Sequence, residues 1–160
     1  SYKNHDIYFI GRGQDYAVAL EGSLKLKEIS YIHSEAYASG ELKHGPIALI
    51  ENNTLVLGIA TNPVTAPKTM SNIEEVIARG ADTIFITNQN STTDELSENK
   101  SITKSDIEKV HYLIEVPEIN TFLSPISTII PMQLFAYYIA KAKKLDVDKP
   151  RNLAKSITVE

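Results

Sequence analysis

Short apolar runs alternate with longer segments of helical periodicity along this chain. The first run, residues 7–10, contains only isoleucine, tyrosine and phenylalanine and is followed by Gly11-Arg12-Gly13. β-Branched and aromatic runs of this length, ended by glycine, predict buried strands. Three later segments read in the same way, namely residues 55–60, 83–87 and 110–116.

Two helices are predicted between these strands. Asp15 is a suitable N-cap for a helix that reaches about residue 31, and Gly80 is a suitable stop for a helix over residues 66–79. Strands that alternate with helices predict an α/β fold, a three-layer αβα sandwich with a mostly parallel, flavodoxin-like sheet. Ligands in such sheets bind beyond the carboxyl ends of the strands, here residues 11–13, 61–63 and 88–90.

A last helix is predicted to begin at Ser124-Pro125, with serine as its cap and proline at its first position, and to end near residue 144. It overlaps an apolar stretch, residues 122–140, whose length is near that of a membrane span. Because proline and hydroxyl residues interrupt this stretch, a buried core helix is predicted instead, with no membrane contact. The polar segment 88–105 is predicted to be a solvated, mobile loop.

The composition mainly excludes classes of protein. A chain of 160 residues fits one domain, and a formal net charge of −4 argues against a nucleic-acid surface, which needs a basic patch. The absence of cysteine excludes a disulfide framework, a thiolate metal site and a cysteine nucleophile. We expect a cytoplasmic protein that uses no cofactor and no metal.

Three charged residues of the first predicted helix share one face. Glu21, Lys25 and Glu28 are spaced at i, i+4 and i+7, and apolar residues such as Leu20 and Leu24 border them. Spacing alone is compatible with an ordinary salt-bridge ladder or with an acid–base site. The apolar border favours a stripe that is not a free solvent face.

Two further features have both a plain and a functional interpretation. His44 lies in a turn between Lys43 and Gly45-Pro46, either as a surface histidine or as a group that moves protons near neutral pH. The polar C-terminus, residues 146–160, is either a frayed tail or a lid over a site. Gly11-Arg12-Gly13 is compatible with a phosphate site at the next helix, but the pattern favours a plain glycine-rich strand-to-helix turn.

Taken together, these segments resemble the glucosamine-6-phosphate synthase family. The likeness lies in residues 11–13, 19–31, 35–37, 40–46 and 148–160. It implies that residues 1–160 form a single SIS domain, the second half of an isomerase module, including a catalytic tail over residues 146–160. A first SIS subdomain and a glutaminase domain would precede it. The family's phosphate loop lies in that first subdomain, and here the corresponding turn contains Pro63 and Pro67.

The resemblance also implies roles in the conversion of fructose 6-phosphate to glucosamine 6-phosphate. Glu28 matches the base that shuttles a proton between C1 and C2, and Lys25 can hold charge on the enediol oxygen. Glu21 is expected to support the substrate site. His44 matches a histidine that opens the sugar ring in the neighbouring subunit's site, which implies a homodimer.

The tail carries the remaining expected contacts. Lys155 matches a lysine that forms a Schiff base with the ketose C2, and Ala154 matches a backbone contact to the sugar. Two other classes remain open. A stand-alone phosphosugar isomerase or deglycase would need its own Ser/Thr phosphate loop, and a sugar-phosphate-sensing regulatory module would usually accompany a helix-turn-helix.

Overall fold

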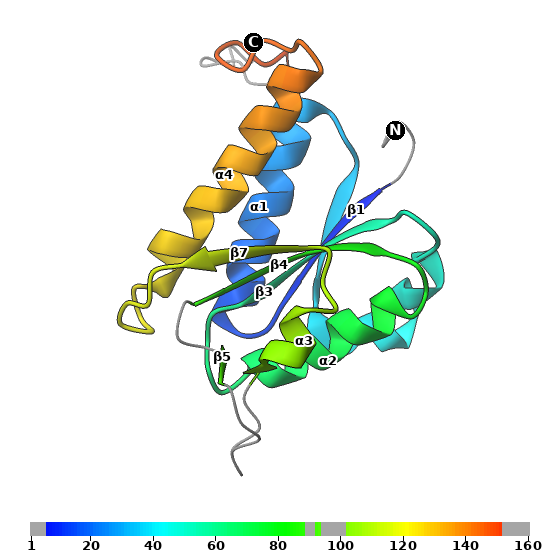
Figure 1. Ribbon diagram of the computed structural model, residues 1–160. Coiled ribbons are helices and arrows are strands. Elements are labelled where there is room, and N and C mark those ends of the chain that lie inside the picture. Colours follow the sequence, from blue (N-terminus) through cyan, green and yellow to red (C-terminus); the bar gives the residue numbers. More distant parts are fainter. Residues whose placement is uncertain (1–5, 89–91, 94–101, 152–160) are drawn as a thin grey trace.

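The computed structural model describes residues 6–88, 92–93 and 102–151 and contains a five-stranded, all-parallel sheet (Figure 1). The strand order is β2-β1-β3-β4-β7, so the first strand in sequence lies inside the sheet. The strands are β1 (Ile7–Gly11), β2 (Ser34–Ala38), β3 (Leu55–Ala60), β4 (Asp82–Asn88) and β7 (Tyr112–Val116). Two further short strands, β5 (Thr92–Thr93) and β6 (Ile102–Thr103), pair with each other.

Helices cover both faces of the sheet, which confirms the predicted three-layer α/β sandwich. The long helices α1 (Gln14–Ser30) and α4 (Ser124–Ala142) pack against each other on one face (Figure 1). The other face is covered by α2 (Ala66–Ile77), with the short helix α3 (Lys104–Ile107) and the 3-10 helix η1 (Ser39–His44) beside it. A second 3-10 helix, η2 (Pro46–Leu49), follows η1.

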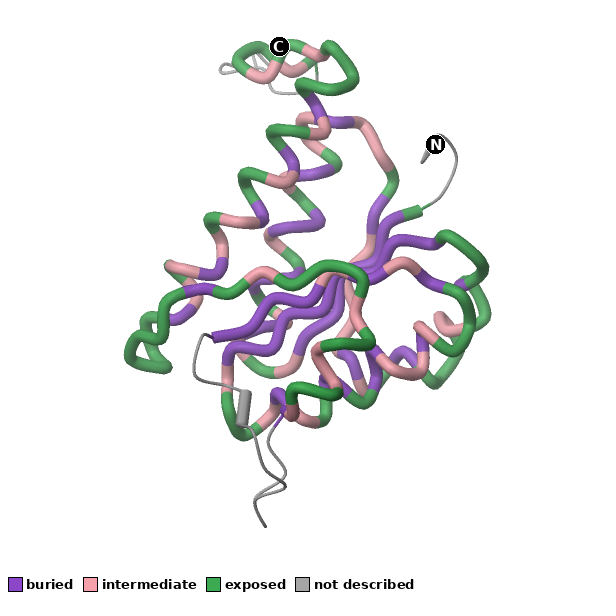
Figure 2. Tube along the Cα trace, in the orientation of Figure 1, coloured by how far each residue is buried: buried purple, intermediate pink, exposed green. Residues whose placement is uncertain are grey.

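The alternation of side chains along β1 divides the core in two. Ile7 and Phe9 pack with α1 and α4, whereas Tyr8 and Ile10 pack with α2 and η1. All four side chains are at most 3% exposed. Figure 2 shows that the central strands are buried throughout, whereas buried and exposed positions alternate along the helices. A strand that is apolar on both faces needs a layer on each side, and this chain supplies both.

Both predicted N-caps are wrong. Gly13 is the N-cap of α1, and the buried Asp15 instead accepts hydrogen bonds from the turn after β3. Leu123 precedes α4, and the hydroxyl of Ser124 donates to the Thr121 carbonyl. Pro125 nevertheless lies in the first turn of α4 as predicted, and Gly80 follows α2 with a φ of +89°.

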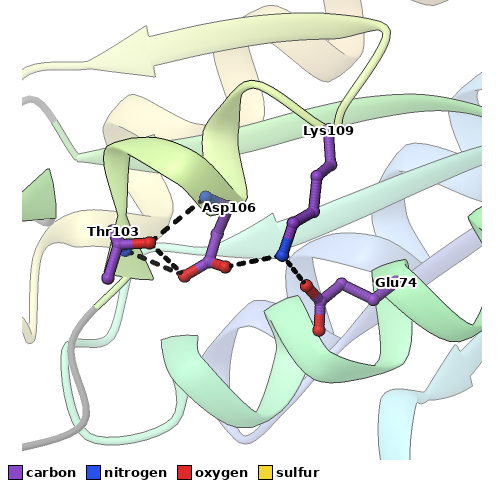
Figure 3. Close-up of polar contacts among 4 residues, drawn as sticks. All are labelled: Glu74, Thr103, Asp106 and Lys109. Atoms are coloured by element: carbon purple, nitrogen blue, oxygen red, sulfur yellow. Dashed lines mark hydrogen bonds and ion pairs between the residues drawn. The ribbon is translucent and has the colours of Figure 1, made fainter.

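The polar segment 88–105 differs in part from its prediction. Residues 89–91 and 94–101 lie outside the described residues, so the loop prediction is untested there. Near the end of the segment, however, Ile102 is 1% exposed and packs in the core with α2. Thr103 then caps α3 reciprocally with Asp106, and Lys109 joins Asp106 to Glu74 of α2 (Figure 3).

The last helix is buried along one side only. Met132, Ala136 and Ala140 are at most 1% exposed, whereas Ile126 and Tyr138 are more than half exposed. The predicted core helix is therefore confirmed for its inner side alone. Within the part of the chain that the structure describes, no helix combines the length and apolarity needed to cross a bilayer.

Asp106→Asn should destabilise the fold by about 1 kcal/mol at neutral pH, the usual size of a capping interaction. Burial acts to raise the pKa of Asp106, but hydrogen bonds from Thr103 and Lys109 outweigh it and lower the pKa. The stabilisation is therefore complete above the unfolded pKa, about 3.9, and is lost as the pH falls through the folded value.

Urea unfolding of this variant and the wild type between pH 3 and 7 measures that difference. Glu108→Gln removes the same charge from an exposed neighbouring position and serves as the control. A difference for Asp106→Asn that stays constant across this pH range would contradict the proposed cause.

Candidate active site

The charged stripe of α1 forms one ion-paired cluster. The Nζ of Lys25 lies 2.8 Å from Oε2 of Glu28 and 3.4 Å from Oε1 of Glu21. The side chain of Glu28 is 19% exposed, that of Lys25 34% and that of Glu21 43%. The structure thus brings together the three α1 residues that the sequence singles out, with Glu28 the most enclosed.

The electrostatics of the cluster favour a protonated lysine. The hydrogen bond to Glu28 is the largest influence on Lys25, and together with the charge of Glu21 it raises the lysine pKa against the effect of burial. Partly exposed ion pairs of this kind contribute only about 0–1 kcal/mol to stability. The fold therefore does not depend on the cluster, which presents a fixed cation one hydrogen bond away from a carboxylate.

The border of the stripe is apolar but open. Leu20 is 47% exposed and Leu24 is 41% exposed, although the sequence interpretation expects a stripe that solvent does not reach. On the adjacent helix α4, the outward side chains of Ile130 and Leu134 are about half exposed as well. The charged cluster therefore lies on the layer formed by α1 and α4, and this layer also carries many of the exposed large apolar side chains.

The chain returns to the end of α1 within its C-terminal tail, at Arg151. The amide of Arg151 donates to the hydroxyl of Tyr31 at 2.9 Å, and the guanidinium of Arg151 lies 4.0 Å from the centre of the same ring. Tyr31 is three residues beyond Glu28. The last described residue of the chain is thus anchored at the C-terminal end of α1, while Ala154 and Lys155 lie outside the described residues.

His44 is not brought together with Lys25 and Glu28. It is the exposed last residue of η1, whose Leu42 is fully buried on the face of the sheet covered by α2. Lys25 and Glu28 belong to the helix on the opposite face. Within one chain, the sheet separates the histidine from the charged cluster.

The carboxyl edge of the sheet, where ligands are expected in such folds, is filled by the chain's own polar groups. Both carboxylate oxygens of Asp15 accept hydrogen bonds: one from the Thr61 hydroxyl at 2.5 Å, the other from the amides of Thr61 and Asn62 at 2.9 and 3.3 Å. Burial raises the pKa of Asp15, and these hydrogen bonds oppose the rise. The amides of Thr61 and Asn62 are therefore already paired within the chain.

Sequence reasoning missed this role of Asp15, because its partners lie 46 and 47 positions away and no local pattern marks them. In the described ranges, no three His, Cys, Asp or Glu side chains are grouped so that they could hold a metal ion. The chemistry available near Glu28 is that of a carboxylate and an ammonium group.

The sequence of the chain is similar to those of known proteins. Residues 2–141 match the family model of the SIS domain. The chain is 54% identical over 155 residues to a glutamine–fructose-6-phosphate aminotransferase (isomerizing) of Clostridium perfringens, and 52% identical over 160 residues to that of Clostridium tetani. These alignments include 97% and 100% of this chain but only 24% of the length of each relative.

A solved structure agrees with these sequence matches. The C-terminal domain of glucosamine-fructose-6-phosphate aminotransferase from Francisella tularensis superposes with a TM-score of 0.75 and 39% identity. The match covers 91% of this chain and 38% of that one. The similarity therefore extends over nearly all of this chain and over a minor part of the longer proteins.

Proposed function

The chain belongs to the SIS domain family, and from that premise we propose that it is the second isomerase half of a glutamine–fructose-6-phosphate aminotransferase. Residues 1–160 would then be one domain that includes the catalytic tail, residues 146–160. The observation that carries the proposal is the Lys25–Glu28 pair at 2.8 Å, on the same helix whose C-cap, Tyr31, holds Arg151 of that tail. Since the chain spans about a quarter of its relatives, the whole reaction is proposed only for the complete protein.

In the proposed reaction, fructose 6-phosphate and ammonia yield glucosamine 6-phosphate and water. Glu28 takes a proton from C1 and returns it to C2, which a single carboxylate near the sugar can do. Lys25 remains an ammonium group, because Glu28 and Glu21 raise its pKa, and it stabilises negative charge on the enediol oxygen. Glu21, whose Oε1 lies 3.4 Å from the Nζ of Lys25, would support the lysine and the substrate site.

Lys155 is proposed to form the Schiff base. Its amine attacks the ketose C2 and water leaves. Ammonia then displaces the lysine amine, so that the nitrogen of ammonia remains on C2. Lys155 follows the anchored Arg151 by four residues, a span of at most about 14 Å. This reach includes the end of α1, where Glu28 lies, and Ala154 would contact the sugar through its backbone.

His44 is proposed to open the sugar ring in the site of a second copy, so that the working protein is a homodimer. The separation of His44 from Glu28 by the sheet supports this arrangement, because one domain cannot place both groups on one sugar. The open apolar surface of α1 and α4 supports a further partner. We propose that the first SIS subdomain covers it, with the glutaminase domain supplying ammonia.

The first test concerns the acid–base pair in the complete protein. Glu28→Gln should lower kcat by about 10²–10⁴-fold, because the amide cannot carry the proton. Lys25→Met should also lower kcat, whereas Lys27→Met, an exposed control on the same helix, should not. Glucosamine 6-phosphate formation from fructose 6-phosphate and glutamine is the measurement, and unchanged turnover by Glu28→Gln would refute the proposed base.

The second test concerns Lys155. Borohydride added with fructose 6-phosphate should reduce the imine and label Lys155, which peptide mass spectrometry locates. Lys155→Arg keeps the charge but cannot form the imine, so it should abolish the label. Lys25, held as an ammonium by its carboxylate partners, is the internal control. A label on Lys25, or one that persists in Lys155→Arg, contradicts the assignment.

The third test concerns the second copy. Glu28→Gln and His44→Ala versions of the complete protein should each be impaired, and mixing them should restore activity. Mixed dimers would contain one site with both residues intact. Absence of recovery after subunit exchange has been verified by mass would place His44 in its own subunit's site.

A further inference from the structure

Arg12 lies at the junction of three elements, and the proposed mechanism gives it no task. It follows β1, and its Nη2 donates to Oδ1 of Asn72 at 3.2 Å, where Asn72 is a 3% exposed residue of α2. A Cβ placed on Gly40 of η1 would lie 2.8 Å from the same Nη2 and 3.2 Å from Nη1. The guanidinium therefore fills the space between α2 and the backbone of η1.

The contact with Gly40 is a matter of space and not of backbone conformation. Gly40 is not among the glycines with positive φ, so an alanine is compatible with its backbone. An added methyl group would instead meet a guanidinium that Asn72 already holds. Gly40 thus allows η1 to lie directly against Arg12.

The same short helix ends at His44, which is exposed and whose side chain makes no hydrogen bond or ion pair with the other described residues. Its position depends on how η1 is fixed. Leu42 is fully buried in the core beside α2, and the Nζ of Lys43 lies 2.5 Å from Oε1 of Glu75. Both of these contacts hold η1 on the side of α2. Arg12, which lies in the turn after β1, packs against η1 at Gly40 in addition to these contacts.

We propose that Arg12 is a positioning residue that fixes η1, and through it His44, by packing its Asn72-bound guanidinium against Gly40. The inference rests on the proposed role of His44. It extends that role, because it makes ring opening in one subunit depend on a part-buried contact inside the other. Arg12 itself does not touch the sugar in this account.

The experiment uses the complete protein with Arg12→Ala, Gly40→Ala and the double variant, and exposed Arg79→Ala as a matched control. Arg12→Ala and Gly40→Ala should both accelerate hydrogen exchange of the amides of residues 40–44. Both should also lower turnover of fructose 6-phosphate, on the order of 10²-fold for a misplacement of about 1 Å. In the Arg12→Ala background, Gly40→Ala should cost less, because the obstructing guanidinium is gone.

A substrate that cannot cyclise separates positioning from general damage. 5-Deoxyfructose 6-phosphate lacks the hydroxyl that closes the ring, so its turnover should be spared in the Arg12 and Gly40 variants and lost in Glu28→Gln. Equal losses on both sugars, or unchanged exchange over residues 40–44, would overturn the inference. An inactive His44→Ala beside an unimpaired Arg12→Ala refutes only this inference, whereas a fully active His44→Ala refutes the proposed function of His44.

Discussion

The fold depends on one constraint, which is that β1 is apolar on both faces. Phe9 and Ile10 are adjacent and both fully buried, so one needs cover from α1 and α4 and the other from α2 and η1. Each parallel crossover places the next helix on one face or the other. The sheet therefore cannot be approached from either side, and every group that reacts with a ligand has to lie on the outer layers or at an edge.

That constraint explains why the candidate chemistry is divided. Glu28 lies on the outer part of the α1 layer and His44 at the end of η1 on the other layer, with the buried sheet between them. Small movements do not join groups that a close-packed core separates. A site that used both groups would therefore need a second copy of the chain, and in this way the layer order supports the proposed homodimer.

The elements that the sequence predicts well are those with a strong local signal. The strand at residues 55–60 and the helix that Gly80 ends are recovered within two residues, because apolar runs and glycine act locally. Strand β2 escaped prediction because Ser34–Ala38 is a mixed polar edge strand. The Glu21–Lys25–Glu28 cluster was visible from helical spacing, but the placement of His44 was not, since it depends on which face η1 covers.

Asp15 shows how a residue with a plausible local role can serve a long-range one. An aspartate near a helix start is read from sequence as a cap, but here it is 1% exposed and holds the turn after β3 through Thr61 and Asn62. Asn88, at the end of β4, adds a hydrogen bond to the Thr61 carbonyl from the other side. A carboxylate fixed in the first turn of α1 occupies the position where the helix dipole would otherwise favour a phosphate. Part of this edge is thus occupied by the chain's own hydrogen bonds, and the candidate pair of Lys25 and Glu28 lies instead toward the far end of α1.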